Sequence, residues 1–201
     1  MYSRRRALSP APSHDAKLSG VEISPVMTAT ELERVSIPGK VTELIRGQLV
    51  VREPPGSHHG AVAAKLTYYL AEFVYRRGLG TVFAQDTGFK ITADPDTVRA
   101  PDVAFVARER ADRIPARGYA ALAPDLLAEV LSPDDRPGEV LAKVADWLAA
   151  GTRLVWLVDP ERTELRVYRA DGSLTVLGAH DALDGEDVLP GFGCPVTQVF
   201  S

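Results

Sequence analysis

The sequence has very little cysteine and no long apolar run. Cys194 is the only cysteine among 201 residues, so neither an internal disulfide nor a cluster of thiolate metal ligands can form within one chain. This scarcity favours a reducing cytoplasm, and we interpret Cys194 as a small filler residue. The longest apolar runs, such as residues 154–158, are far shorter than the roughly 20 residues of a membrane-spanning helix. The sequence therefore predicts a globular protein without a membrane segment.

Positive charge is outnumbered by negative charge. The chain has 23 Lys and Arg against 27 Asp and Glu, a net charge of −4. In residues 1–26, four basic and two acidic side chains give +2, so residues 27–201 carry −6. This balance argues against broad coating of nucleic acid, in which Lys and Arg neutralise phosphates. It does not exclude a basic groove beside an acidic metal site.

The first 26 residues differ from the rest of the chain. They mix Pro, Ser, Ala and charge, with neither an apolar period nor the apolar core of a signal peptide. We predict a disordered tail, in which Arg4, Arg5 and Arg6 could touch DNA or simply be solvated. For residues 27–201 we predict a single domain, since this length is ordinary for one hydrophobic core.

Hydrophobic periodicity and turn residues predict an α/β fold. The predicted elements are a β-hairpin at 41–45 and 48–52, a helix at 57–77 capped by Ser57, strands at 81–91, 103–107 and 126–132, a helix at 137–150 capped by Asp135, a strand at 153–158, and a hairpin at 164–169 and 173–177. The strand, helix and strand over 126–158 predict a parallel pair with a right-handed crossover. The expected architecture is a mixed β-sheet flanked by helices, with an N-terminal and a C-terminal β-hairpin.

One carboxylate, Glu129, stands in the middle of an apolar strand-like run. Glutamate is rarely fully buried unless it is paired, because an isolated buried carboxylate is costly or takes up a proton. The position therefore predicts a metal, a solvent-filled cleft or a cationic partner. An arginine from the connection at 108–117 is the alternative partner to a metal.

A second acid, Asp102, follows Pro101 where the next predicted strand upstream begins. If the two strands are neighbours and both acids face the same side, Asp102 and Glu129 can bind one hard cation such as Mg²⁺, with waters completing the octahedron. The alternative for Asp102 is a turn-capping role. The pair indicates a metal site more strongly than either acid alone.

Three further residues are candidates for the same cleft. Lys143 borders the apolar stripe of its predicted helix, so it could reach back toward Glu129 and stabilise developing charge or position a water; a surface lysine is the alternative. His59 faces inward from the first turn of its helix, where hydrogen-bonded packing is the alternative. Glu43 alternates with an apolar neighbour and could point into the cleft or into water.

Several short motifs, in order, resemble a known family. They are ELI at 43–45 followed by Gly47, HG at 59–60, RAPDV at 99–103, APDL at 123–126, EVLSP at 129–133, Gly151 with WLVDP at 156–160, and LPGF at 189–192. No single motif is specific. Their order and spacing over residues 40–200 resemble the PD-(D/E)XK nuclease superfamily, and within it the Uma-type family of putative restriction endonucleases.

The resemblance implies a restriction-endonuclease-like fold and hydrolysis of DNA phosphodiester bonds with Mg²⁺ or Mn²⁺, often by a homodimer. Asp102 and Glu129 would match the metal ligands. The position two residues after Glu129 holds Leu131 rather than the motif lysine, so Lys143 would be the migrated lysine. The residues themselves leave two alternatives open: a non-catalytic nucleic-acid or protein-interaction module with this fold, and an enzyme acting on another phosphate ester.

Overall fold

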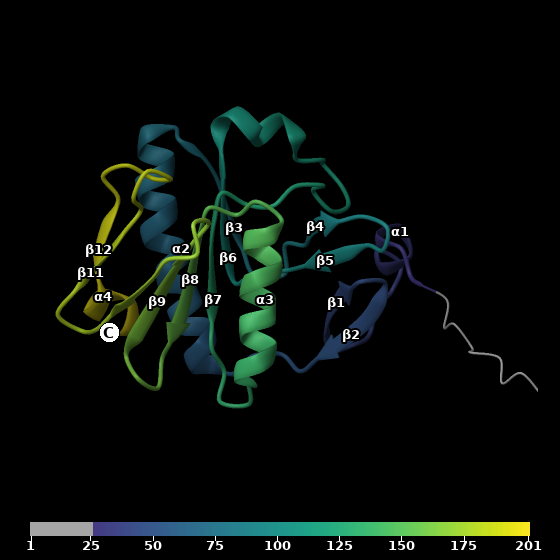
Figure 1. Cartoon of the computed structure of the whole chain (residues 1–201), viewed down its shortest axis with the longest axis horizontal. Coiled ribbons are helices and arrows are strands. Elements are labelled where there is room, and N and C mark those ends of the chain that lie inside the picture. Colours follow the sequence, from purple (N-terminus) through teal and green to yellow (C-terminus); the bar gives the residue numbers. More distant parts are fainter. Residues whose placement is uncertain (1–25) are drawn as a thin grey trace, which may run out of the picture.

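The computed structural model describes residues 26–201 of the chain. The predicted disordered tail, including Arg4, Arg5 and Arg6, lies outside the described residues except for Val26. The described chain forms one large sheet with helices on both faces and a smaller sheet beside it (Figure 1). No helix in this part of the chain combines the length and the apolar character that crossing a bilayer requires.

The large sheet has six strands and is mixed, as predicted. In spatial order they are β10 (Leu174–Leu177), β9 (Glu164–Arg169), β8 (Leu154–Asp159), β7 (Leu126–Val130), β6 (Val103–Ala107) and β3 (Gly80–Ala84). β7 and β8 are parallel and the other pairs are antiparallel. Helix α3 (Pro137–Ala149) joins the parallel pair, which confirms the predicted strand–helix–strand unit. β7 and β8 are buried along their whole length, since helices cover both of their faces.

Two helices cover opposite faces of this sheet (Figure 1). Helix α2 (Ser57–Arg77) packs on one face against side chains such as Leu126. Val144 and Trp147 of α3 pack on the other face against side chains such as Leu127. Because side chains alternate along a strand, Glu129 lies on the same face as Leu127 and points toward α3.

The smaller sheet has four strands and contains the predicted N-terminal hairpin. Its strands, in spatial order, are β2 (Gln48–Arg52), β1 (Val41–Ile45), β5 (Thr97–Arg99) and β4 (Phe89–Thr92). The short helix α1 (Ala29–Leu32) packs against β1 through a separate small core. The predicted hairpin has the expected bounds, whereas β5 was not predicted.

The single strand predicted at 81–91 is wrong. The chain leaves the large sheet after Ala84, turns, and enters the smaller sheet as β4. Asp86 adopts a positive φ of 67° in this turn, and a Cβ at Gly88 would lie 2.5 Å from the Tyr119 ring. The turn lies at residues 85–86, and Gly88 leaves room for Tyr119 from a distant segment.

Both predicted helix caps differ from the structure. Gly56, not Ser57, is the N-cap of α2, and Ser57 is the first helical residue. Arg136 is the N-cap of α3, because Pro137 takes the first helical position. The carboxylate of Asp135 instead accepts the backbone N–H of Ser132 at 2.8 Å and closes the preceding turn.

The C-terminal hairpin of β9 and β10 was predicted correctly, but the last segment contains further structure. The additional elements there are β11 (Ala182–Asp184), β12 (Gly193–Pro195) and α4 (Val196–Phe200). A 3-10 helix, η1 (Arg108–Arg113), follows β6 and was not predicted either. Phe192 stacks on Trp156 with ring centroids 5.7 Å apart. Cys194 is buried in the same core, in agreement with its interpretation as a filler residue.

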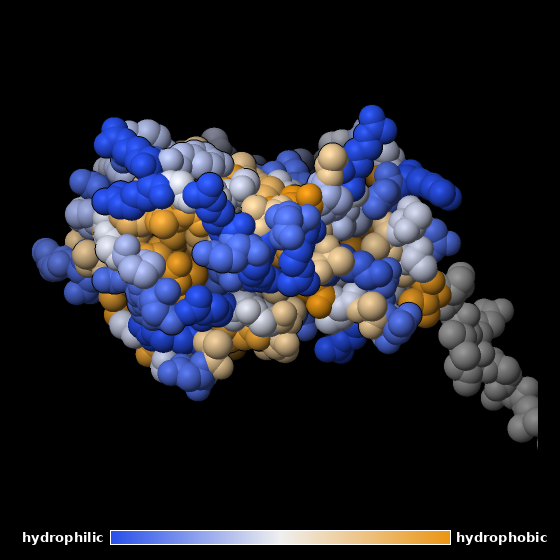
Figure 2. All heavy atoms as spheres, turned by 90° about the horizontal axis from the view of Figure 1, so that it is seen from above, coloured by the Kyte–Doolittle hydropathy of each residue, from blue (hydrophilic) through white to orange (hydrophobic). Residues whose placement is uncertain are grey.

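The surface in the view from above is mainly hydrophilic. Charged and polar side chains project along the length of the molecule, and apolar residues form patches between them (Figure 2). Most of the largest buried side chains, including Trp147, Trp156 and Phe105, lie instead in the two cores on the faces of the large sheet. Leu32 and Leu44 belong to the small core beside β1.

Candidate active site

A pocket of about 600 Å³ lies where the two sheets meet, at the carboxyl end of β7. Its walls come from the β1–β2 hairpin, the first turn of α2, the segments before β6 and after β7, and the beginning of α3. All the site residues expected from the sequence line it: Glu43, His59, Asp102, Glu129 and Lys143. The fold thus gathers residues that are up to 100 positions apart in the chain.

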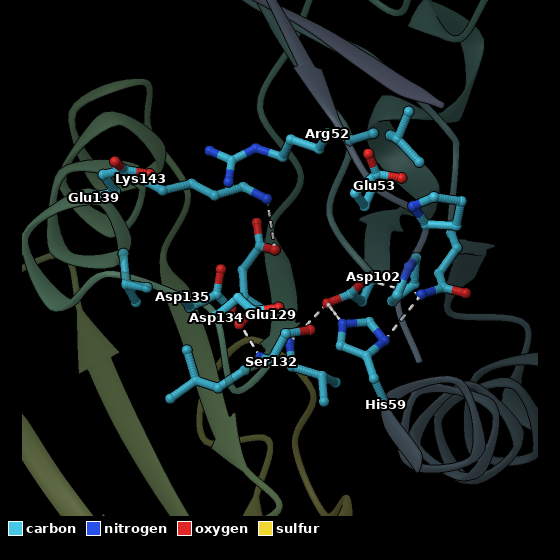
Figure 3. A pocket seen from close by; sticks show the side chains of 18 of the residues that line it. Arg52, Glu53, His59, Asp102, Glu129, Ser132, Asp134, Asp135, Glu139 and Lys143 are labelled. Atoms are coloured by element: carbon cyan, nitrogen blue, oxygen red, sulfur yellow. Dashed lines mark hydrogen bonds and ion pairs between the residues drawn. The ribbon is translucent and has the colours of Figure 1, made fainter. Parts of the chain in front are cut away.

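Asp102 and Glu129 line the same pocket from neighbouring parts of the large sheet. Val103, the first residue of β6, pairs with Ala128 of β7, so Asp102 directly precedes β6 beside the end of β7. Glu129 contacts α3 through Trp147, whereas Asp102 contacts His59 of α2. Asp102 Oδ2 also accepts the backbone N–H of Val130 at 2.7 Å, and both acids project into the pocket (Figure 3).

Two side chains, in addition to the Val130 amide, hold the Asp102 carboxylate. Gln85 Nε2 donates to Oδ1 at 3.0 Å, and His59 Nε2 lies 3.2 Å from Oδ2. Gln85 Nε2 also lies 3.3 Å from His59 Nδ1, so the three side chains form a closed cluster. Burial alone would raise the pKa of Asp102, but these contacts outweigh it and hold that pKa below its usual value. For His59, burial would lower the pKa, but the contact with Asp102 outweighs burial and raises the pKa of His59 above its ordinary value.

Glu129 is held by two side chains of α3. Lys143 Nζ donates to Oε2 at 2.8 Å (Figure 3). Trp147 Nε1 donates to Oε1 at 2.8 Å. Lys143 and Trp147 are four residues apart, so they share one face of the helix. The arginine expected as an alternative partner is not there: Arg110, from the 108–117 connection, pairs with Asp125 at 2.6 Å.

The Glu129–Lys143 pair is strongly perturbed by its surroundings. Burial raises the pKa of Glu129 to about 7, against the opposing effect of Lys143, and Asp102 adds to the rise. Burial would lower the pKa of Lys143, but Glu129 and Glu43 outweigh it and raise that pKa. The pocket therefore contains a firmly protonated lysine beside a carboxyl group that titrates near neutrality.

Glu43 points into the site rather than into water. It is 2% exposed, its Oε1 accepts the Ala100 N–H at 3.1 Å, and Lys143 Nζ lies 3.6 Å away. Its Oε2 lies 3.4 Å from Arg99 Nη1. Arg99, itself 3% exposed, also donates through Nε and Nη2 to Asp146 of α3, at 3.1 and 2.5 Å.

Sequence reasoning missed several partners in this site. They are Gln85, Arg99, Asp146 and Trp147. The spacing of four residues between Lys143 and Trp147 could have indicated Trp147 as a second partner of Glu129, because residues four apart share one helix face. Nothing local marks Gln85, which lies in the loop that leaves the large sheet.

The donor set fits a hard divalent cation that keeps part of its water shell. In the described residues 26–201, no three His, Cys, Asp or Glu side chains gather as a ready-made ligand cluster. Mg²⁺ in proteins commonly uses only one or two carboxylates and retains several waters. An ionised carboxylate offers about four lone-pair sites, and the contacts with Lys143 and Trp147 use two of those on Glu129. The contacts with Gln85, Val130 and His59 use three of those on Asp102, so each of the two carboxylates has a site left for a cation.

Comparisons with known proteins agree with the resemblance inferred from the motifs. The model of the Uma2 family, described as "Putative restriction endonuclease", matches residues 30–197. A crystal structure of a "putative nuclease belonging to DUF820" from Anabaena variabilis shares the fold, with a TM-score of 0.73 and 22% identity over 87% of this chain and 97% of that chain. None of the curated proteins compared with the chain matches it. Because the family match spans most of the chain and every residue of the pocket, the chain belongs to the Uma2 family.

Proposed function

We propose that the protein is a metal-dependent endonuclease that hydrolyses DNA phosphodiester bonds in this pocket. Membership of the Uma2 family supports a nuclease role. The observation that carries the proposal is that Asp102, just before β6, and Glu129, in the adjacent β7, line one pocket, with the Lys143 amine 2.8 Å from Glu129. The role of each residue in catalysis follows from this arrangement.

Asp102 and Glu129 would hold a Mg²⁺ or Mn²⁺ ion, which would lower the pKa of a bound water and polarise the phosphoryl group. Lys143, kept protonated by Glu129 and Glu43, can donate a hydrogen bond to a phosphoryl oxygen or to the attacking water. Gln85 and His59 orient the Asp102 carboxylate and keep it ionised. Glu43 supports the site by keeping a second negative charge near the lysine.

Cleavage assays test this proposal. Supercoiled plasmid and single-stranded DNA are incubated with the wild type, Asp102→Asn and Asp171→Asn, in Mg²⁺, Mn²⁺ or EDTA. Asp171 is a matched control because it lies in the exposed β9–β10 turn. We expect Asp102→Asn to lose roughly 100-fold or more of the rate and the control to keep it. Equal cleavage by the wild type and Asp102→Asn would refute the assignment.

A second function is favoured by one specific observation. Both oxygens of Glu129 already have protein partners, which suits a non-catalytic nucleic-acid or protein-interaction module that retains a nuclease fold. Calorimetry with Mn²⁺ separates the two. If the site is catalytic, we expect the wild type to show a heat of Mn²⁺ binding that Glu129→Gln loses. If the site has lost its catalytic function, we expect no heat of Mn²⁺ binding with either protein.

We also propose that the protein acts in the cytoplasm as a homodimer. A single buried cysteine suits a reducing compartment, and the nuclease resemblance implies pairing of two chains. Light scattering on the purified protein would test the dimer. A mass of one chain across the accessible concentration range would contradict it.

A further inference from the structure

The pocket has many negative charges and few positive ones. Its acidic lining residues are Glu43, Glu53, Asp86, Asp102, Glu129, Asp134, Asp135 and Glu139. The lysine and arginine side chains in the lining are Lys143 and Arg52. A phosphodiester is an anion, so it needs a cation that is not already neutralised. Lys143 is engaged by Glu129 at 2.8 Å, whereas Arg52 has only Glu43 near it, at 3.7 Å, and is the less neutralised of the two cations.

Arg52 is positioned by the register of the first hairpin. It pairs with Val41, and Glu43 pairs with Val50, so Val41, Glu43 and Arg52 share the hairpin face that lines the pocket. Its guanidinium group extends across the pocket toward Lys143, which comes from the opposite wall (Figure 3). A ligand lying over Glu129 would therefore meet both cations.

The guanidinium group lacks hydrogen bonds within the part of the chain that the structure describes. Nε is buried without a hydrogen-bond partner there, and the nearest carboxylate oxygen, Glu43 Oε2, is 3.7 Å away, beyond hydrogen-bonding distance. That oxygen already faces Arg99 Nη1 at 3.4 Å. Nε itself is closed to solvent, but the side chain of Arg52 as a whole is 38% exposed and lines the pocket, so a ligand there can reach the outer part of the guanidinium group.

We infer that Arg52 binds the non-bridging oxygens of the substrate phosphodiester in this pocket. A planar guanidinium matches two phosphate oxygens with two parallel N–H donors, which a lysine cannot do. This inference rests on the proposed function and deepens it, because it assigns the contact with the phosphate to the smaller sheet and the metal ligands to the large one. Substrate binding thus requires both walls of the pocket.

Binding measurements test this contact separately from cleavage. A fluorescein-labelled DNA duplex is titrated with the full-length wild type, Arg52→Gln, Arg52→Lys and Arg76→Gln, in EDTA and again in Ca²⁺, from 50 to 300 mM salt. Arg76 is the matched control, because it is exposed near the far end of α2 and pairs only with the neighbouring Glu72 in the described chain. Circular dichroism and thermal unfolding establish that each variant is folded.

We expect Arg52→Gln to weaken binding roughly tenfold and to reduce the slope of log K against log salt by about 0.9, the value for one phosphate contact. Arg52→Lys should keep the slope but bind more weakly than the wild type, since it retains the charge without the two-donor geometry. Arg76→Gln should behave as the wild type.

The outcomes separate this inference from the proposed function. Wild-type affinity and slope in a folded Arg52→Gln, or no duplex binding by the wild type in either buffer, would overturn the phosphate contact even if DNA is cleaved. Loss of binding in Arg52→Gln, in a protein that cleaves no DNA, would support the contact and refute the catalytic proposal.

Discussion

At the scale of single residues, the site depends on charges that are buried with dedicated partners. Glu129 is 7% exposed, and its two oxygens are held by an ammonium group and an indole N–H. Asp102 is held in the same way by a backbone amide and two side chains. Such contacts fix each carboxylate in one orientation, which a metal site needs because its ligands must be preorganised.

Replacing Lys143 by methionine tests the role of its charge. Lys143→Met keeps most of the side-chain volume but removes the donor to Glu129 and to any phosphoryl oxygen. We expect the single-turnover cleavage rate to fall roughly 100-fold or more. Lys65→Met, on α2 outside the pocket, is the control and should retain wild-type activity. Full activity of Lys143→Met would exclude this lysine from the reaction.

The environment of Asp96 predicts how the free energy of unfolding depends on pH. Its carboxylate accepts the Ala29 N–H at 2.8 Å and pairs with Lys90 at 2.7 Å. Burial opposes ionisation, but Lys90 and the Ala29 amide outweigh it and lower the pKa of Asp96. A lowered pKa in the folded state stabilises the protein above the unfolded value of about 3.9, and this stabilisation is lost as pH falls through the folded value.

The measurement is urea unfolding of the wild type and Asp96→Asn from pH 7 to pH 3. We expect the variant to be about 1 to 3 kcal/mol less stable at pH 7, and the difference to narrow as the wild-type carboxylate becomes protonated. A difference that stays constant over this range would show that the charge of Asp96 contributes nothing.

At the scale of elements, α3 is the part that links the two sheets. It packs on the large sheet through Trp147 and is tied to the smaller sheet by the Arg99–Asp146 pair. The same helix carries Lys143. The rotation of α3 about its axis therefore decides whether the lysine reaches Glu129.

Removing Arg99 should loosen this link. Arg99→Met leaves the buried Glu43 and the partly buried Asp146 without their shared partner, and breaking a buried ion pair costs about 3 to 5 kcal/mol. Chemical denaturation should show a loss of this order. Arg162→Met, an exposed residue in the turn after β8, should change stability by less than about 0.5 kcal/mol. A similarly small change for Arg99→Met would contradict the proposed link.

At the scale of the whole molecule, negative charge is concentrated around the pocket of an already acidic protein. A divalent cation that binds there would relieve the repulsion between these carboxylates and stabilise the folded state. The proposed metal site can therefore be detected by stability alone, without a DNA substrate.

Thermal unfolding with added Mn²⁺ makes this measurable. At about 100 times Kd, a ligand that binds only the folded state adds about 2.7 kcal/mol, or on the order of 5 to 10 °C in Tm for a chain of this size. We expect the wild type to show this rise and the double variant Asp102→Asn, Glu129→Gln to lose it. Equal rises in both proteins would place the ion elsewhere.

Local sequence patterns predicted most of the elements. Alternation identified the β1–β2 and β9–β10 hairpins, helical spacing identified α2 and α3, and apolar runs identified β7 and β8. These features depend on interactions between near neighbours in the chain. The division of 81–91 between two sheets was missed, because the sheet that each half joins is set by pairing with strands outside the segment, β6 for β3 and β5 for β4.

The sequence by itself determined which side chains carry charge in apolar surroundings, because an acid within a strand such as β7 is visible in the pattern of residues. Only the tertiary structure decided which groups neutralise them. Glu43 meets Arg99 across 56 positions, and Asp102 meets the Val130 amide across 28. Such pairings depend on strand register and helix rotation, and these are set by packing of the whole core rather than by any local run of residues.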